Sequence, residues 1–587
     1  MSAPLAPNGT LLAPPEFRGV FRTDDDARGV YSESAGVARI LPDAVAVPAD
    51  AEDVVTLVQW AATHHVPIVP RGSASSMANG AIGRGVALDL SRLDAMGTVD
   101  PATATVWCGP GALRDTVDAA ARAHGLRFPV DPSSGAFCTM GGMCASNAAG
   151  TRTVKLGATR AWVRGLDCVF ADGTRAWIRR GEPRPKLEVL RTFQAEVSRD
   201  ALERGHTMVH AGVRKESSGY GLAAYAQGGD LVDLLVGSEG TLAIFVGVEL
   251  ALAPVPAADA ALLASFATLE DAVQAAGRAT EFGASAVELL DRTFLDVVRA
   301  EAAMLSIPPG AEAVLLMEAE GATPADTDTL ALRLGDACRA AGATHVVTAG
   351  TKAEADRLWH IRHAASPILN KLDPNLASMQ LVEDGAVPPA RFPDYVRGVR
   401  AALDRNRIRG VIFGHAGDAH AHVNALIDVR DADWKARARA LLEDVTGLVA
   451  LLGGTLAAEH GDGRLRTPLM HRVWDARAMS MFARVKLAFD PMGILNPGVK
   501  VGRVGDDPLA SVKYDPTLPP LTASARTALD TVVRTGRGAR IGSTCWRRAS
   551  GSGGRVRYWR PEAGRYDASM VPASRMARGT SPDRGRS

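Results

Sequence analysis

Two short polar stretches in the second half of the chain carry residue types that can bind a divalent metal. GHAGDAHAHVN and AAEHGDGR contain, in chain order, His415, Asp418, His420, His422, Asn424, Glu459, His460, Asp462 and Arg464. Two imidazoles and a carboxylate suit Zn²⁺ or Mn²⁺ and leave coordination positions open for a substrate. A cluster of surface or core histidines would use the same residue types. The residues VIFGH indicate a buried strand ending at His415, and sites are often held at the ends of rigid elements, which favours a metal.

Small residues gather in two stretches of the first half. The stretches are PRGSASSMANGAIG, residues 70–83, and DPSSGAFCTMGGMCASNAAGTRTVKLGAT, residues 131–159. Small side chains let backbone N–H groups approach a phosphate, and serine hydroxyls can donate to it. Each stretch alone is more often an ordinary loop. Neither is a dinucleotide or Walker fingerprint, but the pair could hold the two ends of a pyrophosphate.

The elements expected around these stretches alternate between strands and helices. Residues 44–48 and 66–70 read as short strands, and the apolar residues of 51–65 share one face of a helix. From about residue 256, Ala/Leu-rich helices are separated by strands such as AVLLMEAEG and GVIFGHAG. This pattern predicts a second α+β domain whose helices cover a sheet.

Composition narrows the class of protein. The 587 residues contain 66 basic and 65 acidic side chains, which argues against a nucleic-acid binder with a basic body. Six scattered cysteines without a C-x-x-C pair favour a reducing compartment. No secretory signal or run of about 18 apolar residues occurs. We therefore expect a soluble cytoplasmic protein without a transmembrane segment, and peripheral contact with the inner face of the membrane stays open.

The two small-residue stretches together resemble the FAD-binding domain of the vanillyl-alcohol-oxidase (PCMH) type. WVRGLDCVFADGT, KESSGYGL and VGSEGTLAIF match further family segments in the same order. The resemblance implies an α+β fold, with a two-subdomain FAD-binding domain followed by an α+β cap domain whose antiparallel sheet is covered by helices. It implies that FAD is bound by Arg71, Gly72, Ser73, Ala74, Ser75, Ser76, Gly141, Gly142, Ala145, Asn147, Ala148, Gly150, Glu239, Gly240 and Asn496. No histidine lies in residues 70–83, so a covalent FAD bond there is not expected.

The polar stretches of the second half resemble the C-terminal domain of the FAD-linked oxidases, which include D-lactate, glycolate and D-2-hydroxyglutarate dehydrogenases. The implied metal ligands are His415, His422 and Glu459. The implied catalytic residues are His460 as base, Arg362 on the substrate carboxylate and Asn424 near the substrate. VEDGAVP and FDPMGILNPGVK match two more family segments. Val382 and His420 stand where Lys and Asn are commoner, which leaves open the acid used, above all a dicarboxylate.

The resemblance also implies an activity and a domain order. We expect FAD and a divalent metal, Zn or Mn, to serve the oxidation of a D-2-hydroxy acid such as D-lactate to the 2-keto acid, by metal-assisted hydride transfer to flavin N5. A quinone, a cytochrome or an Fe–S protein would then accept the electrons. The expected parts are an N-terminal arm (1–37), the FAD-binding domain (38–255), the substrate and metal domain (256–502) and a linker with a basic tail (503–587). The alternatives are a non-redox FAD transferase of the alkyl-glycerone-phosphate synthase type and a non-catalytic or truncated flavin subunit.

The tail has an unusual composition. From Thr531 onward it contains 13 Arg, no Lys, three acidic residues and one cysteine, Cys545. Related flavoproteins fused to an iron–sulfur half continue with several cluster cysteines, and one cysteine cannot hold a cluster. We hypothesise a frameshifted remnant of an Fe–S domain; the alternative is a natural, disordered basic tail that contacts membrane phosphates or acidic partners.

Overall fold

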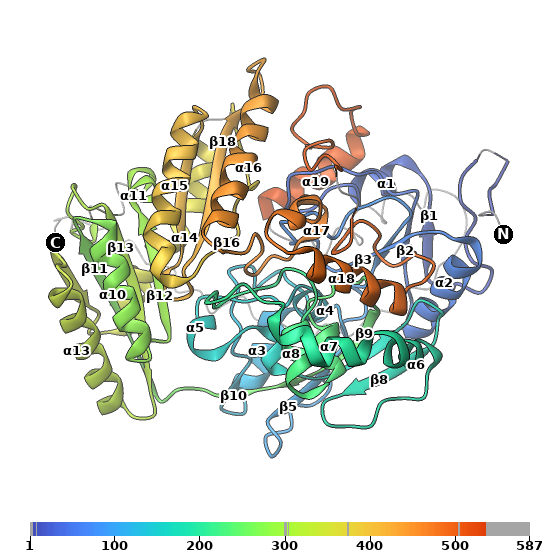
Figure 1. Cartoon of the computed structure of the whole chain (residues 1–587), viewed down its shortest axis with the longest axis horizontal. Coiled ribbons are helices and arrows are strands. Elements are labelled where there is room, and N and C mark those ends of the chain that lie inside the picture. The colour runs from blue at the N-terminus through green and yellow to red at the C-terminus, as the bar shows by residue number, and fades with distance from the viewer. Residues whose placement is uncertain are drawn as a thin grey trace, which may run out of the picture. The chain divides into compact units, whose positions relative to one another are not determined.

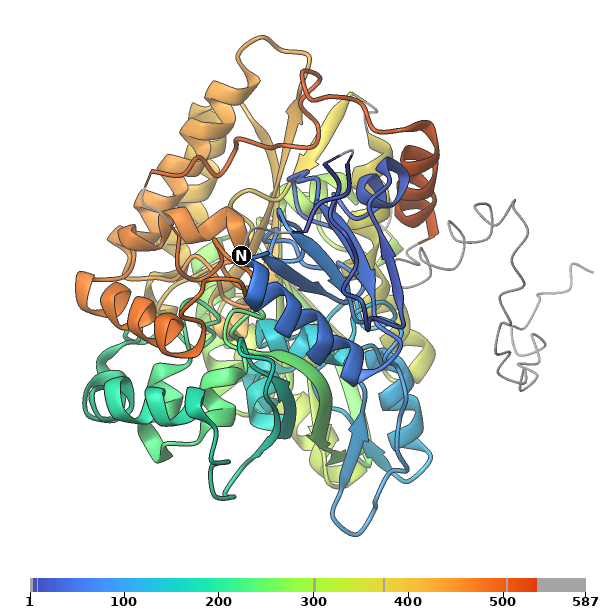
Figure 2. The same ribbon diagram turned by 90° about the vertical axis from the view of Figure 1, so that its right-hand side faces the viewer.

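The computed structural model describes residues 4–535, apart from residues 8, 299–301, 303, 373–374 and 503–504, and without the side chains of 363–372 and 532–535. Figures 1 and 2 show the arrangement of its elements in two perpendicular views. Nearly all of the basic tail, including Cys545 and the hypothesised frameshift remnant, lies outside the described residues. Within the described part, no helix combines the length and the apolar character that crossing a bilayer requires.

The first sheet carries the first small-residue stretch. Its strands are β1 (Val20–Arg22), β2 (Ala44–Val47), β4 (Val86–Asp89) and β3 (Ile68–Arg71), in that order across the sheet. Helix α2 (Ala51–His64) packs on it because Val54, Leu57 and Val58 share one buried face. The carboxylate of Asp50 caps this helix by accepting from two backbone N–H groups. The strands β2 and β3 and the helix α2 were predicted from the sequence and are confirmed, whereas β1 was not predicted.

A second sheet carries the rest of the flavin-domain motifs. Its strands, all antiparallel, are β5 (Thr105–Cys108), β9 (Ile244–Ala251), β7 (Val163–Val169) and β8 (Arg175–Arg179). Its core is shared with α3 (Arg114–Arg122), α4 (Met140–Ser146), α6 (Glu188–Phe193), α7 (Arg199–Arg204), α8 (Leu222–Gly228), α9 (Leu231–Leu235) and α18 (Ala476–Phe489). A short ribbon, β6 (Leu126–Arg127) with β10 (Ala253–Pro254), leads to the cap. The two sheets correspond to the two expected subdomains, and β7 and β9 join them by contributing Val169, Ile244 and Val246 to the core of the first sheet.

The cap is an eight-stranded antiparallel sheet with helices on both faces. The order is β14 (His345–Thr348), β11 (Ala258–Phe266), β13 (Ala313–Gly321), β12 (Ala286–Asp291), β17 (Arg409–His415), β18 (His420–Asp428) and β15 (Leu376–Met379), and β16 (Gly385–Ala386) also pairs with β18. One face is covered by α10 (Leu269–Glu281), α13 (Pro324–Ala340), α15 (Phe392–Arg405) and α16 (Trp434–Leu451) (Figure 1). Part of the other face is covered by α11 (Arg292–Val297) and α14 (Lys352–Leu372). The α+β class and the helix-covered sheet are confirmed.

Along the cap strands, successive side chains alternate between the face that packs in the core and the face that lines the cavity. On β18, Val423 and Ile427 join the large core under α15 and α16. The side chains of His422 and Asn424 point to the opposite face, because successive strand residues alternate. On that face α11 and α14 bury only the apolar end of the sheet, including Phe413. The polar end of the same face is left to line a cavity.

The segment after residue 505 differs from the expected loose linker. Leu509 and Val512 are buried in the cap core. Helix α19 (Ala523–Thr535) packs against α1 (Asp25–Val30), with Ala525 fully buried (Figure 1). The stretch assigned to an N-terminal arm likewise contributes β1 to the first sheet. Both ends of the described chain therefore pack against the rest of the structure through apolar contacts, which were not predicted from their Pro-rich composition.

Candidate functional site

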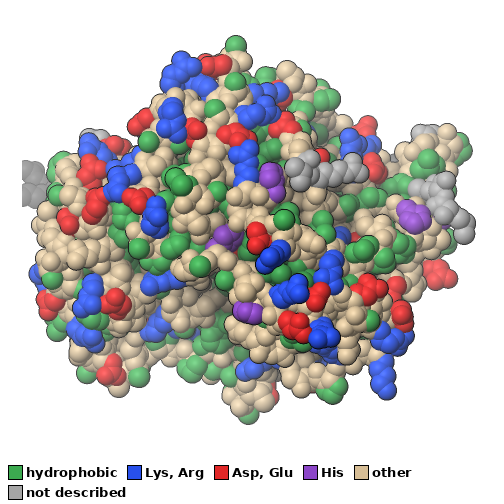
Figure 3. Space-filling view, viewed as in Figure 1, with side chains coloured by type: hydrophobic (Ala, Val, Ile, Leu, Met, Phe, Trp, Pro, Cys, Tyr) green, Lys and Arg blue, Asp and Glu red, His purple; other side chains and the backbone are tan. Residues whose placement is uncertain are grey.

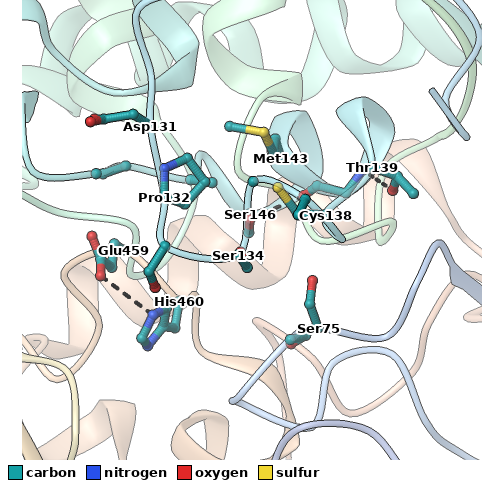
Figure 4. Close-up of a pocket in the computed structure, with 18 of the residues that line it drawn as sticks. Ser75, Asp131, Pro132, Ser134, Cys138, Thr139, Met143, Ser146, Glu459 and His460 are labelled. Atoms are coloured by element: carbon teal, nitrogen blue, oxygen red, sulfur yellow. Dashed lines mark hydrogen bonds and ion pairs between the residues drawn. The ribbon is translucent and has the colours of Figure 1, made fainter. Parts of the chain in front are cut away.

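A cavity of about 1060 Å³ joins the two small-residue stretches to the polar end of the cap sheet. Figure 4 looks into it and shows Ser75 and Ser134 from the flavin half and Glu459 and His460 from the cap half. Every predicted cofactor, metal and substrate residue lines this cavity except Asn147 and Asn496. The structure therefore brings together residues more than 300 positions apart in the chain.

The flavin side of the cavity is shaped by glycines in close contact with their neighbours. A Cβ atom added at Gly72 would lie 2.1 Å from the Thr139 hydroxyl, and one added at Gly141 would lie 2.5 Å from Pro110. Any side chain at these positions would displace the wall, so the backbone itself faces the cavity. A backbone-lined cradle with serine hydroxyls fits the diphosphate of FAD.

Four of the predicted cofactor residues use their side chains to hold these loops. The Arg71 guanidinium donates to the Tyr31 carbonyl oxygen at 2.9 Å and lies over the Tyr31 ring. Asn147 accepts from the Arg160 N–H at 2.9 Å, and Asn496 donates to the carbonyl oxygens of Gly80 and Glu239 at 3.0 and 2.7 Å. The Glu239 carboxylate accepts from the backbone N–H groups of Asp462 and Gly463 at 2.7 and 3.0 Å. Asn147 and Asn496 thus lie behind the wall, where their polar atoms are used by protein partners.

A buried lysine connects four of the sequence motifs. Lys500 Nζ contacts Glu239 Oε1 at 2.9 Å, Asp462 Oδ2 at 3.0 Å and the Ser217 carbonyl oxygen at 2.7 Å. Asp462 also accepts from the Ser218 hydroxyl at 2.7 Å. We call these residues the Lys500 cluster. These five residues come from four motifs, so the cluster ties segments that are far apart in the sequence to one another.

The predicted metal ligands meet at one point. Glu459 Oε1 lies 3.2 Å from His422 Nε2 and 3.6 Å from His415 Nε2, and the two Nε2 atoms lie 3.4 Å apart. Ligand atoms about 2.0–2.2 Å from a tetrahedral Zn²⁺ stand roughly 3.3–3.6 Å from one another, so this set has the size of a metal site. His420 is a further member of this group, since one ligand atom from each of the four residues lies within 4.8 Å of the others.

Outer contacts turn both imidazoles toward that point. His415 Nδ1 lies 2.5 Å from Glu288 Oε1, and His422 Nδ1 donates to the Glu383 carbonyl oxygen at 2.9 Å. With the protons on Nδ1, both Nε2 lone pairs face inward, as in protein metal sites whose histidines are oriented by carboxylates or carbonyls. The residues present therefore fit a divalent cation.

Charge is concentrated around this group. Burial favours a neutral His415, but the Glu288 carboxylate outweighs burial and raises the pKa of His415 to about 9. Burial opposes ionisation of Glu288, yet His415 and Arg362 lower its pKa to about 2. Lys215 Nζ lies 2.5 Å from Glu459 Oε2 and helps to hold the pKa of Glu459 well below its usual range against burial. A bound cation would displace the imidazole protons.

His460 lies beside the metal ligands. Its Nε2 atom is 3.4 Å from Glu459 Oε1, and its Nδ1 atom is 2.6 Å from Glu383 Oε2. Burial favours the neutral ring, but Glu383 and Asp384 raise the pKa of His460 to about 10. Burial raises the pKa of Asp384 to about 6. A divalent cation nearby would lower the His460 pKa by charge repulsion, toward the neutral form that a general base requires.

The predicted substrate residues lie on the adjoining wall. Arg362, on α14, donates from Nε to Glu288 Oε2 at 2.8 Å, and its guanidinium lies 4.5 Å over the Phe413 ring. Asn424, on β18, is buried and lines the cavity. His420 is fully buried with its Nε2 3.0 Å from Asp384 Oδ1 and does not line the cavity. Val382, also buried, does not line it either.

Four residues of the site were missed from the sequence: Lys215, Glu288, Glu383 and Arg466. Lys215 and Glu383 stand inside the motifs KESSGYGL and VEDGAVP, which were noted for their resemblance without a role for either residue. Glu288 stands in the apolar strand sequence AVELLD, where a lone carboxylate is a signal of a buried partner. Arg466 offers no such signal.

Comparisons with known proteins identify the family of both halves of the chain. The family model described as FAD binding domain matches residues 42–179, and the model described as FAD linked oxidases, C-terminal domain, matches residues 255–499. Glycolate oxidase subunit GlcD of Bacillus subtilis is 30% identical over 484 residues, covering 81% of this chain and 93% of that protein. D-lactate dehydrogenase of Archaeoglobus fulgidus is 28% identical over 465 residues, covering 78% and 91%.

Solved structures support the fold. 4-ethylphenol oxidase from Gulosibacter chungangensis aligns with a TM-score of 0.60 at 17% identity, covering 83% of this chain and 94% of that one. An alkyldihydroxyacetonephosphate synthase aligns with a TM-score of 0.57 at 17% identity, covering 84% and 89%. These likenesses concern architecture alone. With both family models matched in order, and 30% identity across nearly the whole of a glycolate oxidase subunit, the chain belongs to the FAD-linked oxidase family.

Proposed function

We propose that this chain is an FAD-dependent dehydrogenase that oxidises a D-2-hydroxy acid, such as D-lactate, to the 2-keto acid. The observation that carries the proposal is the shared cavity, in which Arg362, His460 and the His415, His422 and Glu459 set face the small-residue loops. The relatives named glycolate oxidase subunit and D-lactate dehydrogenase support this class of substrate.

Two bound groups complete the proposal. FAD would be held by the loops at residues 71–76 and 141–150, and a divalent cation, Zn or Mn, by His415, His422 and Glu459. When bound, the flavin supplies a hydride acceptor and the cation supplies a Lewis acid that acidifies the substrate hydroxyl.

The protein's own groups then bind, orient and deprotonate the substrate. Arg362 pairs with the substrate carboxylate, and the Phe413 ring beneath the guanidinium fixes its plane. Asn424 adds a neutral hydrogen-bonding group on the same wall. His460 Nε2, which faces the ligand carboxylate, accepts the proton of the substrate hydroxyl. A fixed carboxylate and a fixed base together determine which enantiomer can react.

The proposed setting is a reducing compartment with a protein or quinone partner. Five cysteines in the described residues are unpaired and buried, in keeping with the cytoplasm. On the face drawn in Figure 3, Lys and Arg side chains lie among Asp and Glu side chains rather than in a patch of one sign. A quinone, a cytochrome or an Fe–S protein would reoxidise the flavin, and contact with the inner face of the membrane belongs to the same proposal.

An anaerobic screen of D- and L-2-hydroxy acids tests the reaction. We expect D-lactate or a close relative to bleach the flavin absorbance, with the L-enantiomer at least about 10²-fold slower. If a complete panel leaves the oxidised flavin spectrum unchanged in metal-loaded protein, the dehydrogenase proposal is wrong. Product formation without any electron acceptor would instead favour the transferase alternative.

A further inference from the structure

We infer that Glu383 is the positioning residue of the His460 base, and that its carboxylate keeps the His460 proton on Nδ1. The inference rests on the proposed function for its catalytic meaning. Glu383 precedes the predicted family aspartate, Asp384, and received no role from the sequence. In the structure it is buried, with an exposed fraction of 1%.

The contact between the two side chains is direct. Glu383 Oε2 lies 2.6 Å from His460 Nδ1, and since a carboxylate can only accept, the imidazole donates from Nδ1. In the neutral ring that a general base requires, the lone pair is then on the other nitrogen, Nε2, which faces the metal ligands and lies 3.4 Å from Glu459 Oε1. The backbone N–H of His460 is held separately, by Asp384 Oδ2 at 2.9 Å. Glu383 therefore makes the hydrogen bond to the ring, whereas Asp384 holds the backbone and lies farther from the ring, with Oδ1 3.8 Å from Nδ1.

The carboxylate of Glu383 is itself fixed in one orientation. Its other oxygen, Oε1, accepts a close contact from Arg466, which is buried and also donates to the Gly461 carbonyl oxygen at 2.5 Å. Arg466 has only donors, so the atom that faces it must be an acceptor. An amide at position 383 would turn its carbonyl toward Arg466 and its NH₂ toward His460. That NH₂ would require a lone pair on Nδ1 and would move the proton to Nε2.

The same residue offers an internal control. The backbone carbonyl of Glu383 accepts from His422 Nδ1 at 2.9 Å and so orients a predicted metal ligand. A side-chain substitution leaves this carbonyl in place. Loss of the carboxylate should therefore impair the base and spare the metal site, which separates this role from a general structural one.

The experiment compares Glu383→Gln, Glu383→Asp and the control Glu203→Gln in FAD- and zinc-loaded protein. Glu203 is an exposed carboxylate on α7 that pairs with Arg199 at 2.9 Å. We expect Glu383→Gln to lower kcat by about 10²–10⁴-fold, the range for loss of a general base or of its correct tautomer. We expect KM and the zinc affinity, measured by chelator competition, to stay within about threefold, and Glu203→Gln to match the wild type.

A second readout is independent of turnover. Long-range ¹H–¹⁵N spectra of histidine-labelled protein, with His460 assigned from His460→Gln, should show the proton on Nδ1 in the wild type and on Nε2 in Glu383→Gln. If Glu383→Gln fails to fold, Glu383→Asp replaces it. Because the shorter carboxylate still accepts from Nδ1, Glu383→Asp should keep the Nδ1 proton, with an intermediate kcat and normal zinc affinity.

Two results would overturn the inference. One is an unchanged His460 tautomer together with a kcat within threefold of the wild type in Glu383→Gln. The other is a loss of zinc affinity as large as the loss of kcat, in either variant, which would show that the side chain acts through the metal ligands. If the wild type oxidises no hydroxy acid, the proposed function fails, and the tautomer spectra still decide whether Glu383 positions His460.

Discussion

The two walls of the cavity are built in opposite ways. In the flavin wall, the two small-residue loops expose the backbone of glycines, alanines and serines to the cavity, beside charged residues such as Arg71 and Glu239. Their glycines at 72, 141 and 150 are in such close contact that a Cβ would collide with a neighbour. The cap wall consists of charged side chains, in which each imidazole has a carboxylate or carbonyl behind it. The flavin wall therefore depends mainly on the shape of its backbone, and the cap wall depends mainly on the charges of its side chains.

This difference teaches which changes each wall tolerates. The flavin wall should be disrupted by substitutions that add atoms, because the backbone must then move. The cap wall should be disrupted by substitutions that remove one partner of an ion pair or hydrogen bond, because a buried charge or polar atom is then left unpaired. Substitutions in the flavin wall should therefore reduce the retention of FAD. Substitutions in the cap wall should instead reduce the rate of the reaction.

Removing the base should give the largest effect on chemistry alone. We expect His460→Ala to lower the rate of flavin reduction by about 10²–10⁴-fold, the typical contribution of a general base. The absorbance spectrum of bound FAD should stay unchanged, because no flavin-wall residue is altered. Rapid mixing with D-lactate measures the first, and a spectrum of the purified protein measures the second. Full activity in this variant would remove His460 from the mechanism.

Removing the metal should come next. His422→Ala deletes one proposed ligand, whose ring otherwise contacts the Glu383 carbonyl oxygen, His415 Nε2 and Glu459 Oε1. Lewis-acid stabilisation worth several kcal/mol corresponds to a fall of about 10³-fold. The zinc or manganese content, measured by elemental analysis, should fall with the rate. A wild-type rate that survives exhaustive chelation would contradict the metal assignment.

Adding one methyl group to the flavin wall tests the other half of the comparison. Gly72→Ala should lower the free energy of unfolding by about 1–3 kcal/mol, the usual cost of overpacking, and should reduce FAD content. Gly277→Ala on α10 is the matched control, since no atom lies within 4 Å of its added Cβ; it should be neutral or stabilising by up to about 1 kcal/mol. Urea unfolding and flavin absorbance would show the contrast. Equal behaviour of the two variants would argue against a shape-defined wall.

A pH series should show a smaller effect, confined to the cap wall. In metal-free protein the pKa of His415 lies near 9, above its ordinary value of 6.5, because the Glu288 carboxylate outweighs burial. The stabilisation by this pair is therefore complete below about pH 6.5 and is lost as the pH rises through 9. Thermal unfolding should show that decline. Glu288→Gln should reduce the decline, and so should zinc, which replaces the proton; the part that remains in Glu288→Gln is expected from His460, whose pKa Glu383 and Asp384 raise to about 10. An undiminished decline in Glu288→Gln would contradict the role of the His415 pair.

The sequence alone was sufficient to predict the site residues that lie close to one another in the chain. His415 and His422 lie on neighbouring strands of one hairpin, and Glu459 and His460 are consecutive, so their grouping and the resemblance they carry were visible. The two-subdomain flavin half and the helix-covered cap sheet followed from periodicity and the same resemblance. The glycines at positions 72, 141 and 150 line the cavity as expected.

The rest depends on contacts between distant segments. Glu288 meets His415 across 127 residues, and Glu383 meets His460 across 77, and no local pattern encodes such a pairing. Asn147 and Asn496 belong to motifs beside the flavin, yet their side chains hold the loops from behind. Helix α19 was missed because it follows a Pro-rich stretch and its buried face is short, with only Ala525 and Leu529 buried among its described apolar side chains.

The Lys500 cluster has a consequence for biosynthesis. The loop at residues 71–76 leaves the ribosome early, yet Glu239 lacks its buried cation until Lys500 has been translated. Residues 494–496 also complete the hydrogen bonding of β3, through Ile68, only at that stage. The flavin half therefore cannot complete its native contacts on the nascent chain until residue 500 has been synthesised, although most of its residues are translated before the cap.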